Sequence, residues 1–358
     1  MSARTGRDRS GVDGARAETG GRPSAATGGG RAPRLVGAVD VGATKTLVTV
    51  RPLPLEGWPV GGRIVRIETP GTPSRLVDAV GAALERLARE AGGRLAAVGV
   101  GTPGPLDAAS GVIRHSPNQG WRDVELAALL ADRLAVPVTL DDDANAGALG
   151  ESLLGAGRGS DPVAYVTVGS GIGVGLVVVG RIVRGAHGTA GEIGHLVLDP
   201  AGPLCGCGRR GCVEASASGM GLERRAWSVL RRRTRPDGSR GPWRTADVFQ
   251  AARDGDPDAA RLVAEGEAAL ARGLAAVVAT VDPERIVIGG SIALAHRGYV
   301  ARAARAARRL TIRGGGAPVA VVPAALRGES VLAGAAILGA EVADEPDASQ
   351  RRGHRTPP

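Results

Sequence analysis

Short apolar runs separated by glycine turns alternate with longer helical patterns along most of this chain. Residues 35–39 and 47–50 flank one such turn, and residues 64–67 form a third apolar run. Runs this short, bounded by turn residues, are typical of strands. Residues 73–90 instead repeat apolar positions at the helical period, and a glycine pair ends the pattern. The residues on that apolar face are Leu76, Val77, Val80, Leu84 and Leu87.

The same alternation continues to residue 342. The further expected strands are residues 95–100, 138–140, 163–168, 173–179, 286–288 and 319–322. The further expected helices are residues 124–134, 143–154, 261–281, 300–310 and 330–342, with an exposed arginine-rich loop at 231–243. This order predicts an α/β protein with mixed sheets. A strand, a glycine turn and a strand occur at 35–50 and again at 163–179, which predicts two related lobes.

We expect the following division of the chain. Residues 1–34 are a disordered Gly/Arg-rich tail, and residues 344–358 are a flexible tail. Residues 35–142 form an N-terminal α/β lobe, and the helix at about 330–343 packs back on it. Residues 143–329 form a larger α/β lobe.

Composition narrows the class of function. The chain has 358 residues with 43% hydrophobic content, enough for two globular domains. The net charge of +9 does not indicate nucleic-acid binding. Lys45 is the only lysine among 45 basic residues, and such an excess of arginine is typical of genes rich in GC codons. Base-stacking aromatics are scarce at 2%, and residues 1–34 hold no amphipathic helices for a helix-turn-helix. The chain shows no apolar leader and no run of 18 apolar residues, so we expect a cytoplasmic protein without membrane or nucleic-acid partners.

Two glycine turns have the composition of phosphate-binding loops. The first, DVGATKT, offers Asp40, Gly42, Thr44 and Lys45 after an apolar run, although an ordinary hairpin turn would have the same pattern. In the second, VGSGIGVG, glycines alternate between two strands, as a turn pressed against a ligand requires. Its expected phosphate-binding residues are Gly169, Ser170 and Gly171, and Gly289 and Gly290 follow a third strand. Three such turns suit a nucleotide held between two lobes.

Asp141, Asp142 and Asp143 are consecutive, and three adjacent carboxylates repel one another. In a phosphotransferase, one aspartate accepts the proton of the attacking hydroxyl. A helix N-cap is the alternative interpretation, but a cap requires only one aspartate.

Three cysteines and a histidine form the most specific pattern. Cys205, Cys207 and Cys212 are spaced C-x-C-x4-C among glycines, and His195 lies ten residues upstream. Together they make a Cys₃His set, which is typical of a closed structural zinc site; three free cysteines are the alternative. Glu192, His195 and Glu214 are candidate acceptors for vicinal hydroxyls, although each alone would be an ordinary surface charge.

With these motifs, residues 36–343 resemble the ROK family of bacterial sugar kinases and sugar-responsive repressors. DVGATKT and VGSGIGVG resemble its phosphate motifs, with Ala43 and Val174 where glycine is common. DDDANAGALGE resembles its catalytic motif, with Asp142 where asparagine is common. GTPGPLD and SPNQGW resemble its sugar loops, and GTAGEIGH with CGCGRRGC resembles its sugar and zinc signature.

The resemblance implies an actin-like (ribonuclease H-like), two-lobed sugar-kinase fold with a central cleft, assembled as a dimer or tetramer. It implies ATP, Mg²⁺ and a structural Zn²⁺ as bound species. Asp143 would be the catalytic base, and Asp40, Thr44 and the second turn would meet ATP phosphates and magnesium. The implied sugar contacts are Asn118, Asp142, Glu192, His195 and Glu214.

We therefore expect an ATP-dependent hexose kinase, with glucose as the first candidate substrate. A sugar-sensing regulator and a kinase for fructose, N-acetylmannosamine or N-acetylglucosamine are the alternatives. A helix-turn-helix ahead of the first phosphate motif would mark a regulator, and residues 1–34 do not fit one.

Overall fold

Two five-stranded sheets with the same strand order organise the chain. The computed structural model describes residues 32–116, 119–312 and 318–344. The first sheet has the order β3-β2-β1-β4-β8 and the second the order β11-β10-β9-β12-β13. In both sheets, the first three strands of this order pair with their neighbours in antiparallel fashion. The last two strands run parallel to the third strand and to each other. This matching topology is the repetition predicted from the two strand–turn–strand segments.

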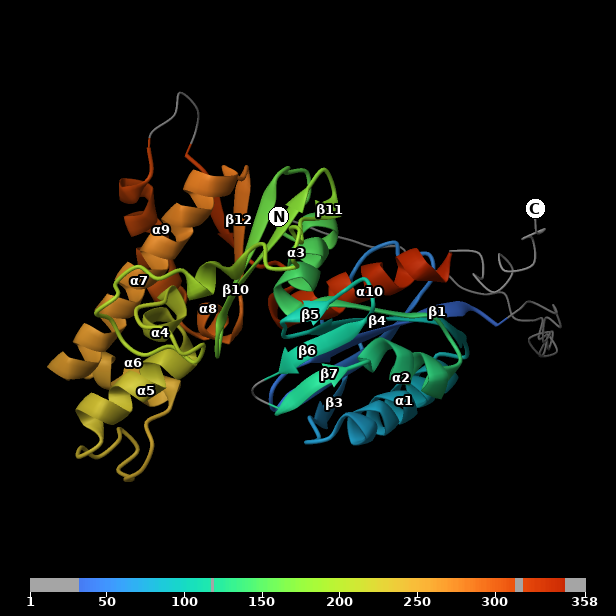
Figure 1. The fold of residues 1–358 in the computed structure, drawn as a ribbon, viewed down its shortest axis with the longest axis horizontal. Coiled ribbons are helices and arrows are strands. Elements are labelled where there is room, and N and C mark those ends of the chain that lie inside the picture. Colours follow the sequence, from blue (N-terminus) through green and yellow to red (C-terminus); the bar gives the residue numbers. More distant parts are fainter. Residues whose placement is uncertain (1–31, 117–118, 313–317, 345–358) are drawn as a thin grey trace, which may run out of the picture. The chain divides into compact units, whose positions relative to one another are not determined.

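The first sheet is built from β1 (Arg34–Val41), β2 (Lys45–Pro52), β3 (Val65–Glu68), β4 (Arg94–Thr102) and β8 (Val138–Asp142). Its apolar side chains pack on one face against α1 (Pro73–Glu90) and α2 (Leu126–Leu134) (Figure 1). The expected apolar stripe of α1 is buried, including Leu76 and Leu84, because both fall on the face that meets the sheet.

The second sheet is built from β9 (Val163–Val168), β10 (Ile172–Val178), β11 (Arg181–Ile182), β12 (Arg285–Gly289) and β13 (Ala320–Pro323). One face of this sheet packs against a helical layer. The helices of this layer are α4 (Val213–Ala217), α5 (Gly219–Leu230), α6 (Thr245–Arg253), α7 (Pro257–Val281), α8 (Ser291–Ala295) and α9 (Arg297–Leu310).

Each sheet is covered by a helix that follows the last strand of the other sheet. Helix α3 (Asp143–Leu154) follows the last strand of the first sheet but packs on β9 and β10 of the second. Helix α10 (Ser330–Ala343) follows the last strand of the second sheet but packs on β1 and β4 of the first. The two helices also pack on each other, with backbones in direct contact at Gly150 and Gly334. A Cβ at position 334 would lie 1.7 Å from the carbonyl oxygen of Ala146, so only glycine allows this approach.

The expected strands and long helices are confirmed, with small shifts at their ends. Helix α7 begins at Pro257, four residues before the expected start, with Asp256 as its N-cap. Residues 124–134 were expected to be one helix, but Val124 ends strand β7 and the helix starts at Leu126.

Some elements were not expected. A three-stranded sheet consists of β5 (Leu106–Asp107), β6 (Val112–Ser116) and β7 (Trp121–Val124). Helices α5 and α6 were not predicted either; two adjacent arginines interrupt the apolar positions of α5, and α6 has only nine residues.

The arginine-rich loop at 231–243 lies between α5 and α6, and most of its residues are exposed, as expected. Several of its arginines are paired with acids of the following helices. Arg233 forms ion pairs with Asp256 and Asp258, so the loop is tied to the start of α7. No helix within the described residues is long and apolar enough to cross a membrane.

Candidate functional site

The first glycine turn is a tight hairpin at the end of β1. The N–H of Gly42 donates to the carbonyl of Lys45 at 2.9 Å, and a Cβ at position 42 would also lie 2.9 Å from that oxygen. The hairpin interpretation is therefore correct for the backbone, and it leaves Thr44 and Lys45 exposed at the tip. Asp40 precedes the turn, where burial raises its pKa to about 6 and Lys45 opposes that rise.

The three consecutive aspartates at the end of β8 have three different environments. Asp141 is fully buried and accepts hydrogen bonds from Arg184 Nε at 2.7 Å and Asn145 Nδ2 at 2.9 Å. Asp142 is the N-cap of α3, and its Oδ1 accepts from the N–H of Ala144 at 2.9 Å. Asp143 is the first residue of the helix. Only Asp142 therefore caps the helix, and the other two aspartates of the cluster have different environments.

Asp143 lies where several negative charges meet. Burial raises its pKa to about 6, and the charges of Asp40 and Glu192 act in the same direction. Burial and the charge of Asp143 raise the pKa of Asp142 well above its ordinary value. The first glycine turn, the aspartate motif and the segment with Glu192 therefore converge here. A carboxylate that titrates near pH 6 is ionised at neutral pH and basic enough to take a proton.

The second glycine turn joins β9 to β10 and is held by the start of α5. The N–H of Gly219 donates to the carbonyl of Gly169 at 2.8 Å, and that of Met220 donates to Ser170 at 3.1 Å. At Gly171, a Cβ would lie 2.7 Å from Oε2 of Glu214. A cavity of about 340 Å³ opens beside Gly169 and Ser170.

Sequence reasoning missed most of the residues that line this cavity. They are Gly219, Met220, Glu223, Thr245, Ala246, Ser291, Ile292 and His296. They come from α5, α6 and α8, which lie 50 to 120 residues beyond the turn, so no local motif could connect them with it.

Some of these glycines are required by the packing of the protein. At Gly173 and Gly175 of the second turn, a Cβ would meet Ala144, the second residue of α3. A Cβ at 175 would lie 2.1 Å from the carbonyl oxygen of Ala144, because β10 crosses the first turn of α3 there. Gly289 faces the ring of Tyr165, and Gly290 faces the backbone of Val168 with φ of 92°.

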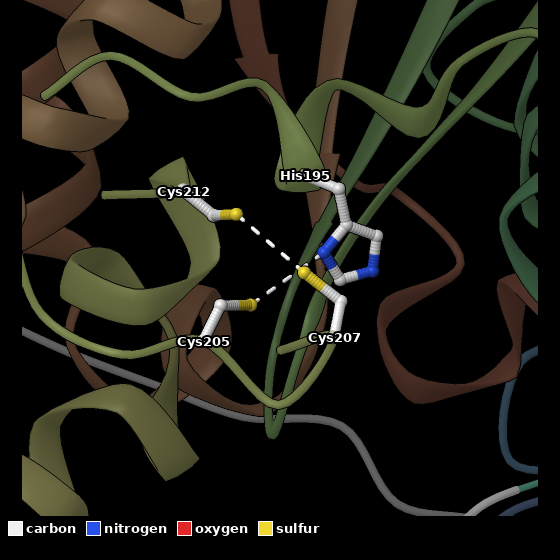
Figure 2. A group of neighbouring side chains, drawn as sticks. All are labelled: His195, Cys205, Cys207 and Cys212. Atoms are coloured by element: carbon white, nitrogen blue, oxygen red, sulfur yellow. Dashed lines mark hydrogen bonds between the residues drawn. The ribbon is translucent and has the colours of Figure 1, made fainter. Parts of the chain in front are cut away.

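The Cys₃His set forms one compact cluster. The ligand atoms of His195, Cys205, Cys207 and Cys212 all lie within 4.8 Å of one another. Figure 2 shows the His195 ring and the three cysteine side chains turned toward a common centre. The Sγ atoms of Cys207 and Cys212 are 3.7 Å apart, and Cys205 Sγ lies 3.6 Å from Nδ1 of His195.

These separations fit a tetrahedral zinc ion. With Zn–S bonds of about 2.3 Å, two sulfur ligands of a tetrahedron lie about 3.8 Å apart, and a sulfur and a nitrogen lie slightly closer. The donor set of three thiols and one imidazole is also one that zinc prefers. The four side chains would thus complete the coordination of one ion and leave no open position.

Three of the candidate sugar residues, Glu192, His195 and Glu214, lie at the same cluster. Glu192 and His195 begin and end the short 3₁₀ helix η1 (Glu192–His195), and Nε2 of His195 lies 3.9 Å from the Glu192 carboxylate. With Nδ1 turned to the cysteines, Nε2 is the nitrogen that remains for a ligand. Glu214 accepts from the N–H of Ile172 at 3.0 Å and so connects the cysteine loop with the second glycine turn. Asn118 lies outside the described residues.

Comparison with known proteins gives a consistent result. The model of the ROK family matches residues 36–342. The chain is 40% identical to a glucokinase of Thermotoga maritima over 208 residues, 55% of this chain and 64% of that protein. It is 33% identical to a glucokinase of Streptomyces coelicolor over 86% of this chain and 97% of that protein. A xylose repressor of Bacillus subtilis is 39% identical over 36% of this chain and 33% of its own length.

Solved structures show the same relationship. A ROK hexokinase from Thermus thermophilus is 40% identical, with a TM-score of 0.73 over 87% of this chain and all of that chain. A ROK glucokinase from Streptomyces griseus, in complex with glucose and AMPPNP, is 33% identical, with a TM-score of 0.71 over 86% of this chain and 99% of that chain. The predicted α/β, actin-like two-lobed fold class is therefore confirmed.

Proposed function

Because the chain belongs to the ROK family, we propose that it is an ATP-dependent sugar kinase that transfers a phosphoryl group to a hexose hydroxyl, with glucose as its substrate. One observation carries this proposal. Burial raises the pKa of the Asp143 carboxylate to about 6, and the charges of the nearby Asp40 and Glu192 act in the same direction. The base, the first phosphate turn and the sugar segment thus meet at one point, as a phosphoryl transfer requires.

Asp143 acts as the general base in this proposal. It is ionised at neutral pH and takes the proton of the sugar hydroxyl as that oxygen attacks the γ-phosphate. Its place at the start of α3 fixes its direction, because Asp142 caps the helix immediately before it. Most of the rate enhancement comes from holding the two substrates in line.

The nucleotide side is formed by the glycine turns. Backbone N–H groups of Ser170 and Gly171 are offered to phosphate oxygens, together with Thr44 and Lys45 of the first turn. Gly42 and Gly169 shape the two turns, because their N–H groups donate to the carbonyls of Lys45 and Gly171. The cavity of about 340 Å³ beside Gly169 holds the adenosine, and Gly289 and Gly290 directly precede Ser291, which lines it. Asp40 is a carboxylate at the phosphate end, where it would hold Mg²⁺ or its bound water. The ion would neutralise the charge that develops on the phosphates.

The sugar side is formed by Asn118, Asp142, Glu192, His195 and Glu214, whose side chains hydrogen-bond the hydroxyls of the hexose. A zinc ion held by His195 and the three cysteines has a structural role in this proposal. The donor set and its spacing support it. With Nδ1 of His195 on the metal, the direction of Nε2 is fixed for the sugar.

A panel of sugars in a coupled ADP-release assay tests the proposal. We expect turnover with glucose, and the ratio of kcat/KM between glucose, fructose, N-acetylmannosamine and N-acetylglucosamine identifies the substrate. A chain that binds none of these sugars, or that releases ADP equally without sugar, would contradict a hexose kinase.

A sugar-sensing regulator is the second candidate, favoured by the similarity to xylose repressors. It predicts sugar binding in calorimetry without ADP release. Retention of the candidate base Asp143 and of both phosphate turns favours the kinase, because a regulator requires only the sugar side.

A further inference from the structure

A second cavity, of about 470 Å³, lies among α6, α7, α8 and α9. His296 separates it from the cavity beside the second glycine turn, because this residue lines both. The ring of His296 stacks on Phe249 with centroids 3.7 Å apart. The wall between the two cavities is therefore a packed aromatic pair.

The cavity carries an excess of positive charge. Three arginines line it: Arg253, Arg297 and Arg302. Arg302 is neutralised by Glu267, with Nε 2.8 and 2.9 Å from the two carboxylate oxygens. Arg253 and Arg297 form no ion pair with a described residue, and Arg253 donates only to the amide oxygen of Gln250 at 2.6 Å. Arg253 also lies close enough to His296 to lower the pKa of that imidazole, in addition to burial.

The remaining walls are of two kinds. Arg297, Gly298 and Tyr299 form the first turn of α9, which has no side-chain cap, and the N–H of Tyr299 donates to the carbonyl of His296 at 2.9 Å. Phe249, Val263 and Ala264 supply apolar surface. A volume of several hundred Å³ with apolar walls and a few convergent polar groups is typical of small-molecule sites.

We propose that this cavity is a binding site for a small organic phosphate, separate from the proposed nucleotide and sugar sites. The guanidinium groups of Arg253 and Arg297 hold the phosphate, since arginine matches phosphate oxygens in geometry and charge. The organic part lies on Phe249 and Val263. The proposal does not rest on the proposed kinase activity, because binding at this cavity is measured without turnover.

The experiment is isothermal titration calorimetry of the full chain with glycerol 1-phosphate, and separately with inorganic phosphate, in a phosphate-free buffer. Glucose and a non-hydrolysable ATP analogue are present at saturation, so that the proposed active site is occupied. We expect saturable binding of glycerol 1-phosphate with one site per chain, and weaker binding of inorganic phosphate, which lacks the organic part.

Two kinds of variant locate the site. Ala264→Glu places a carboxylate in the cavity, and Ala268→Glu places the same charge one turn further along α7, outside the lining. Arg253→Gln with Arg297→Gln removes both unpaired arginines, and Arg305→Gln, on the exposed face of α9, is the matched control. We expect Ala264→Glu and the double variant to raise Kd by about tenfold or more, and the controls to leave it within about twofold.

Three results would overturn the proposal. One is the absence of saturable binding by the wild-type chain. Another is binding of glycerol 1-phosphate that occurs without the ATP analogue and is lost in its presence, because the cavity would then be part of the nucleotide site. The third is equal weakening by Ala264→Glu and Ala268→Glu, which would indicate attraction to the general surface charge.

Discussion

Nε of Arg184 lies 2.7 Å from Oδ2 of Asp141, a carboxylate that is only 1% exposed. Arg184 belongs to the segment between β11 and η1, whereas Asp141 ends β8 immediately before Asp142 and Asp143. The ion pair therefore links the segment that carries Glu192 to the strand that carries the candidate base. It also neutralises one of three consecutive aspartates, which reduces the repulsion within the cluster.

Replacing this arginine should destabilise the fold. Arg184→Gln leaves the buried Asp141 charge with neutral donors only, and loss of one partner of a fully buried pair costs about 3–5 kcal/mol. The Arg184 side chain is 43% exposed, so solvent screens the pair and we expect about 1–3 kcal/mol. Urea unfolding measures the loss, with exposed Arg181→Gln as the control. Adding Asp141→Asn to Arg184→Gln should recover part of the stability; no recovery would show that the pair is not the cause.

Asp143→Asn should abolish most of the turnover while sugar binding persists. The amide cannot accept the hydroxyl proton, so kcat should fall by about 10²–10⁴, the usual contribution of a general base. Steady-state kinetics gives kcat, and calorimetry with glucose gives the binding constant. The variant should also be at least as stable as the wild type at pH 7.5, because burial of the ionised Asp143 opposes folding there.

That stability difference depends on pH in a defined direction. The pKa of Asp143 is raised from 3.8 to about 6 in the folded protein, so the wild-type side chain favours the folded state when protonated and loses that contribution as pH rises through 6. The Tm advantage of Asp143→Asn should therefore be largest above pH 6 and vanish toward pH 4. Near wild-type kcat in this variant would place the base elsewhere, with Asp142 the nearest candidate.

For the wild-type chain acting as the proposed kinase, kcat/KM should decline below about pH 6. The base must be ionised to act, and both Asp143 and Asp40 titrate at about pH 6 because of burial. Since the carboxylates interact, the apparent pKa of the profile belongs to the group as a whole. Lys45→Gln should shift the decline to higher pH, because the lysine opposes the raised pKa of Asp40. A profile that stays flat down to pH 5 would contradict a carboxylate base with this pKa.

The contact between α3 and α10 should tolerate no side chain at Gly334. Its Cβ would lie 1.7 Å from the carbonyl oxygen of Ala146, a rigid backbone atom, so Gly334→Ala must force the helices apart. We expect a loss of about 3 kcal/mol or more in unfolding free energy. Gly328→Ala is the control, because nothing lies within 4 Å of a Cβ there. Equal denaturation midpoints for the two variants would show that the helices can separate without cost.

Features encoded by neighbouring residues could be predicted from the sequence. The ligand atoms of the Cys₃His cluster come from residues 195–212, so the spacing alone indicated that they could meet. The strands that flank each glycine turn were predicted for the same reason.

Features that depend on tertiary contacts could not be predicted. Glu151 is fully buried, and its carboxylate accepts from Leu326 N–H at 3.0 Å and from the Ser330 hydroxyl at 2.7 Å. Nothing in its helix marks this glutamate as different from a surface residue, because its partners lie 175 and 179 positions away. The different environments of the three aspartates likewise depend on Arg184, which is remote in sequence.

The zinc prediction follows from the geometry of His195. Nδ1 lies 3.6 Å from Cys205 Sγ, and Nε2 lies on the side of Glu192. A metal on Nδ1 would fix the ring, and with it the sugar side of the site, without contact to the phosphates. We therefore expect one zinc per chain by metal analysis. Chelation, or Cys207→Ser, should lower Tm and raise the KM for sugar far more than the KM for ATP.

A control separates the loss of the metal from a general disturbance of the loop. Leu204 is 57% exposed and directly precedes Cys205, so Leu204→Ala changes the same loop without removing a ligand. That variant should keep its zinc and its sugar KM. Readdition of zinc should restore the chelated wild-type chain but not Cys207→Ser, because a hydroxyl is a poor replacement for a thiolate ligand. A zinc-free chain with normal sugar KM would remove both the metal and the role of His195 from the proposal.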